Sequence, residues 1–397
     1  MAKPTIVSMP GDGIGKTVLP EALRVLEAAG FQADYVPAEI GWDCWRTQGN
    51  ALPHKTIELL EKHRVGLFGA ITSKPREAAE KELDPKLQGR GLVYFSPIVG
   101  LRQHFNLDIC IRPCRSFPGN PLNFVRRSAD GAVEEPKVDV VVFRQNTEDL
   151  YCGVEWTNPP DAVRKALETH KKMAAFKAVP SRDLAVSCRI LSRPATRRII
   201  AEAFKFAAER GYRSVTVCEK PNVIRETSGM MWSEARAIQK GYPSIQLWDT
   251  NIDAQMMWLT KNPEDYGVVV SSNMFGDIVS DGFAGLVGGL GFAASANLGA
   301  DCAVFEPTHG SAPKYADYPV SIVNPIAAIL SGCLLLEHLG EKKLAAKIAA
   351  AVARVVKAGR VRTYDMLRLK GSPAVLEQGA ASTSQMGDAV IQALKKA

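Results

Sequence analysis

The chain has 397 residues, of which 46% are hydrophobic and 23% charged, with a formal net charge of +7. This length exceeds a single compact core, so we expect two or three domains. The lysines and arginines are scattered in short clusters, which argues against a nucleic-acid-binding surface and is compatible with small anionic ligands such as carboxylates and phosphates.

Strands and helices alternate along most of the chain. Short apolar runs alternate with segments that repeat apolar residues at helical spacing, a pattern typical of an α/β fold with much parallel sheet. In chain order, we predict strands at 5–9, 32–37, 65–70, 107–112, 138–144, 184–189, 215–219, 245–249 and 268–271. Predicted helices lie at 18–29, at 53–63, near 161–175 and from Ala195 onward. The last hundred residues are predicted to be largely helical, with alanine-rich stretches at 326–338 and 342–357.

Residues 149–192 interrupt this alternation. Trp156 is followed by Thr-Asn-Pro-Pro and then by a charged, helix-like stretch. We therefore expect an insertion or arm at this place in the chain.

Cysteine usage and hydropathy bear on the compartment. The eight cysteines form no CxxC pair and lie mostly in apolar segments, so we expect reduced, buried thiols in a cytoplasmic protein. We expect no signal peptide, because the first residues lack an apolar core. The most apolar run, 322–336, contains Asn324-Pro325 and is too short to span a membrane.

A glycine-rich segment, Gly-Asp-Gly-Ile-Gly at 11–15, follows the first strand. It does not match a P-loop, because position 10 is proline, nor a Rossmann fingerprint, because its third glycine comes one residue early. The segment is predicted to be a glycine-rich strand-to-helix turn that can let a ligand approach the backbone closely.

Asp277 and Asp281 are four residues apart in an otherwise apolar segment. On a helix this spacing places both carboxylates on one face, where they could bind Mg²⁺ or Mn²⁺ and leave coordination sites open for a substrate. The alternative is that they cap the helix or pair with a nearby Lys or Arg.

Three arginines, Arg102, Arg112 and Arg144, follow apolar runs. Such guanidinium groups are either structural or bind carboxylates. Together with a candidate metal pair they indicate a polycarboxylate substrate. Tyr151 and Lys220 are candidates for proton transfer, although Lys220 could also be an ordinary loop lysine.

These segments together resemble one family, the decarboxylating β-hydroxyacid dehydrogenases, which include isocitrate, homoisocitrate and 3-isopropylmalate dehydrogenases. The matching segments occur in order over nearly the whole chain. They are Gly-Asp-Gly-Ile-Gly at 11–15, Leu-Arg102, Ile-Arg112-Pro, Arg144-Gln-Asn-Thr-Glu-Asp-Leu-Tyr151, Lys220-Pro-Asn222, Asp277-Ile-Val-Ser-Asp281 and Glu306-Pro-Thr-His309-Gly310.

The resemblance implies an isocitrate/isopropylmalate dehydrogenase-like α/β fold that is distinct from the Rossmann type. It implies a large domain from residues 1–107 and 288–397, and a small domain from residues 108–148 and 193–287. Residues 149–192 are similar to the clasp that interlocks two subunits of bacterial NADP-dependent isocitrate dehydrogenases, so a homodimer with shared active sites is implied.

Residue roles also follow from the resemblance. Tyr151 and Lys220 would be catalytic, and Asp277 and Asp281 would bind Mg²⁺ or Mn²⁺ together with Asp253 of a neighbouring subunit. The residues implied in substrate binding are Ser96, Ile98, Arg102, Arg112, Arg144 and Asn222. Those implied in cofactor binding are Glu306, His309, Gly310, Lys314, Tyr315, Asn324, Tyr364 and Arg368.

The cofactor expected from the resemblance is NADP. Members that use NAD tend to carry an acidic residue after His-Gly-Ser-Ala-Pro, whereas this chain has Lys314-Tyr315 there. With Tyr364 and Arg368, these residues match positions that bind the 2′-phosphate in NADP-dependent isocitrate dehydrogenases.

The substrate is less determined by the sequence. Isocitrate dehydrogenases typically carry Ser-x-Asn before the first arginine, but here Ser96 is followed by Pro and Ile98, as in fungal-type homoisocitrate dehydrogenases. We expect isocitrate first and homoisocitrate second. A non-catalytic regulatory subunit of the same fold is a further alternative, although such subunits typically lose residues that are present here.

Overall fold

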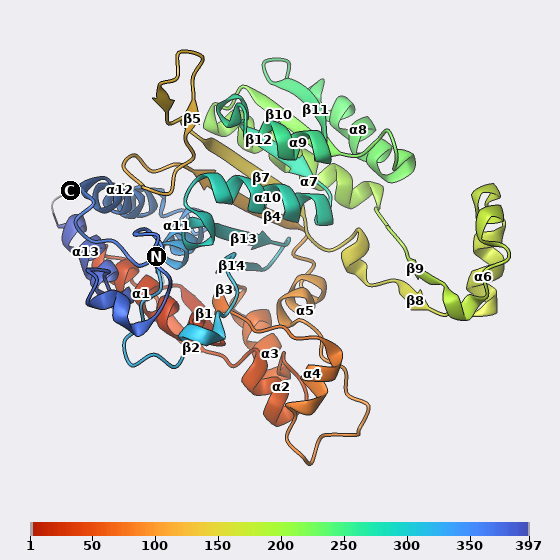
Figure 1. Cartoon of the computed structure of the whole chain (residues 1–397), viewed down its shortest axis with the longest axis horizontal. Helices are drawn as coiled ribbons and strands as arrows, with labels where there is room; N and C mark the ends of the chain where they lie inside the picture. The colour runs from red at the N-terminus through yellow and green to blue at the C-terminus, as the bar shows by residue number, and fades with distance from the viewer. Residues whose placement is uncertain (1–2, 396–397) are drawn as a thin grey trace.

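The computed structural model describes residues 3–395, and within them the centre of the molecule is a 10-stranded sheet (Figure 1). The strand order is β11-β10-β12-β7-β4-β13-β14-β3-β1-β2. These strands are β1 (Thr5–Gly11), β2 (Asp34–Pro37), β3 (Val65–Ala70), β4 (Ile109–Arg115), β7 (Asp139–Gln145), β10 (Ser214–Glu219), β11 (Gln246–Asn251), β12 (Val268–Ser271), β13 (Ala294–Leu298) and β14 (Ala303–Pro307).

Helices cover the sheet, and apolar side chains are buried on both of its faces in both halves. Val7, Met9 and Phe68 pack on one face, whereas Ile6 and Leu67 pack on the other, as alternation along a strand requires. The helices are α1 (Gly15–Ala28), α2 (Trp42–Gln48), α3 (His54–His63), α4 (Arg76–Lys81), α5 (Pro97–His104), α6 (Asp161–Glu168), α7 (Arg193–Arg210), α8 (Arg225–Gln239), α9 (Ile252–Trp258), α10 (Asn273–Leu286), α11 (Ile326–His338), α12 (Lys342–Ala358) and α13 (Thr383–Leu394).

The predicted α/β class with much parallel sheet is confirmed, but the middle of the sheet is antiparallel. Strands β7, β4, β13 and β14 pair antiparallel with one another, whereas the outer strands are parallel. We did not predict β13 and β14, and β14 lies in a part of the chain expected to be largely helical. The β13 sequence, Ala-Ser-Ala-Asn-Leu, lacks β-branched residues and becomes a strand because it pairs on both sides.

The two halves of the sheet come from different parts of the chain. Strands β1, β2, β3, β13 and β14 come from its two ends, and β4, β7, β10, β11 and β12 from its middle. The one sheet runs without a break through both halves. The domain boundaries given above stay a prediction.

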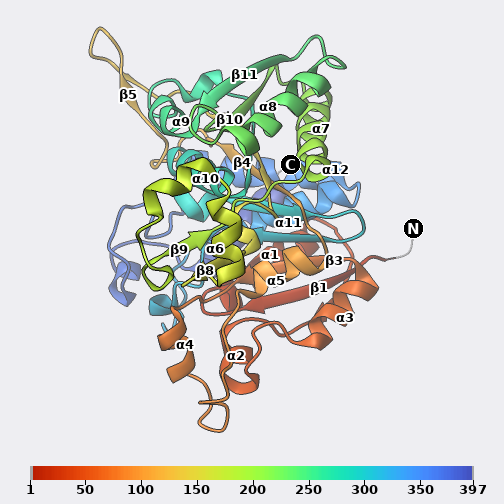
Figure 2. The same cartoon turned by 90° about the vertical axis from the view of Figure 1, so that its right-hand side faces the viewer.

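An arm leaves the body after β7 and projects on the right of Figure 1, where the strands β8 (Glu155–Thr157) and β9 (Ala185–Ser187) form a ribbon and α6 lies at its end. Turned by 90° in Figure 2, the same arm faces the viewer. The helix predicted near 161–175 ends at Glu168 and is followed by a 3₁₀ turn, Lys171–Phe176. A second, smaller hairpin carries β5 (Arg126–Arg127) and β6 (Val133–Glu134).

The glycine-rich turn packs against the protein's own backbone. Gly11 has φ +69°, and a Cβ there would lie 2.0 Å from the carbonyl oxygen of Ala70. Gly13 has φ +52°, and a Cβ there would lie 2.2 Å from the carbonyl oxygen of Ser311. These two glycines are thus required by internal packing, and the approach of a ligand to this turn stays a prediction.

Two further observations concern the cysteines and the hydropathy of the helices. All eight cysteines, each within the described residues, are free thiols. Among residues 3–395 we find no helix that is both long enough and apolar enough to cross a membrane.

Candidate active site

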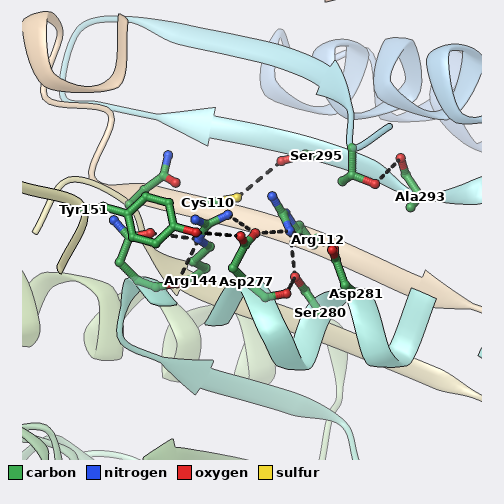
Figure 3. A network of polar contacts seen from close by, with 12 residues as sticks. Cys110, Arg112, Arg144, Tyr151, Asp277, Ser280, Asp281, Ala293 and Ser295 are labelled. Atoms are coloured by element: carbon green, nitrogen blue, oxygen red, sulfur yellow. Dashed lines mark hydrogen bonds and ion pairs between the residues drawn. The ribbon is translucent and has the colours of Figure 1, made fainter. Parts of the chain in front are cut away.

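The centre of the sheet and α10 bring the predicted arginines and aspartates together (Figure 3). Arg112 lies on β4 and Arg144 on the neighbouring strand β7, and α10 packs across both strands. Asp277 and Asp281 lie on α10, so the predicted helical placement of this pair is correct.

Asp277 is the centre of this network. Its Oδ1 atom accepts hydrogen bonds from Arg112 Nη1 at 3.0 Å and from Arg144 Nη1, and its Oδ2 atom accepts one from the Tyr151 hydroxyl at 2.9 Å. Arg112 Nη1 also donates to Ser280 Oγ at 2.8 Å and lies 3.3 Å from Asp281 Oδ1. The guanidinium of Arg144 stacks 5.0 Å from the centroid of the Tyr151 ring.

Arg102 does not take part in this network and is bound instead by residues of the hairpin that β13 and β14 form. Its Nε atom donates to Asn297 Oδ1 at 3.1 Å, and its Nη2 atom donates to Glu306 Oε1 at 2.9 Å. Glu306 and Asn297 lie on β14 and β13. Glu306, which we expected to contact the cofactor, therefore binds Arg102, which we expected to contact the substrate.

Burial and neighbouring charges shift the pKa values of several residues in this network. Burial and the positive charges of Arg112 and Arg102 lower the pKa of Arg144 to about 10, so it remains charged at neutral pH. Burial opposes ionisation of Asp277, but Arg144 and Arg112 outweigh it and lower the pKa of that carboxyl. Burial raises the pKa of Asp281.

These residues line a cavity of about 570 Å³. Its wall includes the predicted residues Ser96, Ile98, Arg102, Arg112, Arg144, Tyr151, Asp277, Glu306, His309 and Gly310. Within the described chain, Arg112 Nε and His309 Nε2 are buried there without a hydrogen-bond partner. Unsatisfied buried polar atoms in residues of a cavity wall mark a place where a water, an ion or a polar ligand can be bound. A larger cavity of about 690 Å³ lies beside α2 and α3, where Lys16 and Asp43 already pair with each other.

Three further residues of the wall, Thr72, Ser73 and Lys74, were missed from the sequence. They directly follow the carboxyl end of β3, which is where ligands bind in open α/β sheets, and that position could have revealed them. Lys74 Nζ pairs with Glu82 Oε1 at 2.5 Å and lies 5.1 Å from the Trp42 ring centroid.

Lys220, Asn222 and Asp253 are not brought to this cavity. Lys220 Nζ forms an ion pair with Asp253 Oδ1, at the ends of β10 and β11, and Asn222 is exposed. None of the three lines the cavity within the described chain. Their predicted roles stay a prediction.

Three of the four residues predicted for the 2′-phosphate are in contact with one another, and the fourth, Arg368, has its guanidinium bound to another segment. The rings of Tyr315 and Tyr364 have centroids 5.5 Å apart, and Lys314 Nζ lies 4.6 Å from the Tyr315 ring centroid. Arg368 instead donates to the carbonyl oxygen of Pro121 at 2.9 Å. Asn324 donates to Asp365 Oδ2 at 3.1 Å.

Comparison with known proteins identifies the family. The family model described as isocitrate/isopropylmalate dehydrogenase matches residues 5–390. The chain belongs to this family. Enzymes of the isocitrate/isopropylmalate dehydrogenase family are decarboxylating dehydrogenases that act on small polycarboxylates with a nicotinamide cofactor and a divalent metal.

Similar proteins differ in their named substrates. Homoisocitrate dehydrogenase of Methanocaldococcus jannaschii is 37% identical over 97% of this chain and 96% of its own length. Protein DlpA of Legionella pneumophila is 36% identical over 98% of this chain, which spans only 58% of that protein. The crystal structure of isocitrate dehydrogenase from Methylococcus capsulatus superposes with a TM-score of 0.79 at 33% identity, covering 99% of both chains.

Asp277 and Asp281 fit the divalent metal that this family uses, but they make up only part of a metal site. Asp277 and Asp281 offer hard carboxylate oxygens one helical turn apart, which suits Mg²⁺ or Mn²⁺. Within residues 3–395, however, there is no group of three acidic, His or Cys side chains that could hold a metal. Further ligands must come from the substrate, from water or from a second chain.

Proposed function

We propose that this protein oxidatively decarboxylates a 2-hydroxy polycarboxylate, in the first place isocitrate to 2-oxoglutarate, with NADP and Mg²⁺ or Mn²⁺. The observation that carries the proposal is the convergence of three buried guanidinium groups on one cavity beside two carboxylates and a tyrosine. Guanidinium groups in a buried site bind carboxylates through paired, charge-assisted hydrogen bonds.

Each residue has a defined task in this proposal. Arg102, Arg112 and Arg144 bind substrate carboxylates, and the Nε atom of Arg112 is a buried donor that has no hydrogen-bond partner within the described chain. Asp277 and Asp281 would hold the metal, which when bound would supply Lewis-acid stabilisation of negative charge on substrate oxygen. The Tyr151 hydroxyl then supplies a proton to the enol carbon, and Lys220 takes part in deprotonation of the hydroxyl.

The wall around the distal part of the substrate supports an anionic arm. Ser96, Thr72, Ser73 and Lys74 line the cavity, and the Lys74 ammonium group, although it is paired with Glu82 Oε1, would favour a third carboxylate over an apolar substituent. Ile98 is 8% exposed and packs mainly in a hydrophobic cluster, so it offers no hydrogen bond. Homoisocitrate, which has a longer arm, is therefore the second candidate.

The proposed choice of NADP rests on Lys314 and the two tyrosines beside it. An ammonium group and phenolic hydroxyls suit a 2′-phosphate, whereas a carboxylate at that place would repel it. We also propose a cytoplasmic location, on the basis of the free cysteines.

A homodimer with shared sites accounts for the position of Lys220 and Asp253 away from their own cavity. Large apolar side chains are exposed on α9 and α10, the helices that carry Asp253 and Asp277: Met257 is 49% exposed, Trp258 45% and Ile278 42%. Exposed apolar surface of this kind marks an interaction site. We propose that a second copy covers it and contributes Lys220, Asn222 and Asp253.

The test is a spectrophotometric assay for NADPH with isocitrate, homoisocitrate and 3-isopropylmalate, each with and without Mg²⁺. We expect turnover that depends on the metal and is fastest with isocitrate. A regulatory subunit of the same fold would turn over none of the three.

A further inference from the structure

We propose that Arg189 is a positioning residue that holds three catalytic segments together. The segments are the turn from Asp149 to Tyr151, the end of β10 before Lys220, and the start of α10 before Asp277. The inference rests on the proposed function, which gives Tyr151, Lys220 and Asp277 their roles.

All five N–H donors of the Arg189 guanidinium have partners. Nε donates to Asp149 Oδ1 at 2.6 Å, and Nη2 donates to Glu219 Oε2 at 2.9 Å and to Ser272 Oγ at 2.7 Å. Nη1 donates to the hydroxyls of Thr227 and Ser228 at 2.9 and 3.1 Å. One side chain thus joins the base of the arm to β10, α8 and α10.

The two carboxylates that bind Arg189 also hold the beginning of α10. Asp149 Oδ2 accepts a hydrogen bond from the backbone N–H of Met274 at 3.0 Å, and Glu219 Oε1 accepts one from the N–H of Ser272 at 2.8 Å. The side chain of Ser272, the residue before the helix, makes no capping hydrogen bond of its own. The N-terminus of α10 is therefore capped by residues of other segments, and Arg189 keeps them in place.

Asp149 needs such support because its backbone is strained. It has φ +70°, a region that residues with a side chain seldom adopt and that persists only where the surroundings enforce it. Its N–H donates to the carbonyl oxygen of Ile190, next to Arg189, at 2.8 Å. The direction in which the chain leaves Asp149 determines where Tyr151 lies.

The arrangement of these three segments is sensitive to loss of Arg189, because its two carboxylate partners are buried. The side chain of Glu219 is fully buried, that of Asp149 is 1% exposed and that of Arg189 10% exposed. Without the guanidinium, two buried carboxylates would be left without a counter-charge and would have to move or take up protons. Either change displaces the start of α10 and the residues next to it.

The test compares Arg189→Met and Arg189→Lys with a matched control, Arg164→Met. Arg164 is also a buried arginine, but its partners are Glu168 and the carbonyl groups of Phe176, Lys177 and Val179 within the arm. Steady-state kinetics separates kcat from KM, and amide hydrogen exchange of the enzyme without ligands reports on each segment.

For Arg189→Met we expect kcat to fall at least about tenfold with a much smaller change in KM, because small displacements of catalytic groups are costly. Exchange should rise together in residues 149–152, 219–222 and 272–277. Arg189→Lys, which retains the charge, should recover part of kcat, and Arg164→Met should raise exchange only in the arm.

Two results would overturn the proposal: an equal loss of kcat in Arg164→Met, or increased exchange in the arm alone in Arg189→Met. If the unaltered protein converts no polycarboxylate, the proposed function fails. The exchange pattern then still decides whether Arg189 holds the three segments together.

Discussion

Removing Arg144 tests whether the buried arginines are balanced by Asp277. Arg144 is 2% exposed, and its Nε atom donates to the carbonyl oxygen and the Oδ1 atom of Asn273 at 3.0 and 2.9 Å. Its remaining charge partner is Asp277. In Arg144→Met an unbranched side chain replaces the apolar stem of the arginine without its guanidinium, and Asp277 retains only Arg112 as a cation in contact.

The expected loss of stability follows from the burial of this pair. Leaving one partner of a buried ion pair uncompensated costs about 3–5 kcal/mol. Because the side chain of Asp277 is 32% exposed, solvent screens part of that cost, and we expect about 3 kcal/mol. Activity should fall as well, since loss of a charged hydrogen bond to the substrate is worth about 1.5–3 kcal/mol, or roughly 10–100-fold in kcat/KM.

Urea denaturation of four proteins measures the effect: the unaltered protein, Arg144→Met, Asp277→Asn and the double variant. Asparagine has the shape of aspartate without its charge, so the double variant no longer contains the carboxylate that has lost one of its two cationic partners. It should be more stable than the sum of the single effects predicts, by about 2 kcal/mol. Strictly additive free energies of unfolding would refute the pairing, and an unchanged kcat/KM in Arg144→Met would refute the role of Arg144 in substrate binding.

Three other predictions concern single residues of the site. Tyr151→Phe should lower kcat by about 10²–10⁴-fold with little change in substrate KM, measured by initial rates, and a rate near that of the unaltered enzyme would exclude Tyr151 as the proton donor. Lys314→Asp should lower kcat/KM for NADP at least about tenfold while sparing NAD, because it replaces a cation beside the 2′-phosphate by an anion; equal losses with both cofactors would contradict this placement. Lys74→Met should raise the KM for isocitrate about tenfold and leave the KM for 3-isopropylmalate unchanged, and the reverse pattern would show that Lys74 does not bind a third carboxylate.

Periodic, strongly apolar segments were predictable from the sequence. The strand at 65–70 and the helix at 326–338 have the predicted bounds, and Asp277 and Asp281 lie on one helix as their spacing indicated. Each of these features depends on residues that are neighbours in the chain. The three arginines were recognised because each follows an apolar strand or helix.

Features that depend on distant partners were missed. Strand β13 has a sequence of low strand propensity and is fixed by its neighbours β4 and β14. Gly11 and Gly13 are explained only by the backbone of Ala70 and Ser311 beside them. Arg189 is an ordinary basic residue in the sequence, and its partners come from segments up to 83 positions away.

The most direct test of the account is the dependence of NADPH formation from isocitrate on Mg²⁺, followed at 340 nm with the purified protein. We predict turnover that is abolished by chelation of the metal, restored by adding Mg²⁺ or Mn²⁺, and accompanied by release of one CO₂ for each NADPH. Absence of NADPH formation from isocitrate and from homoisocitrate in the presence of metal would contradict it.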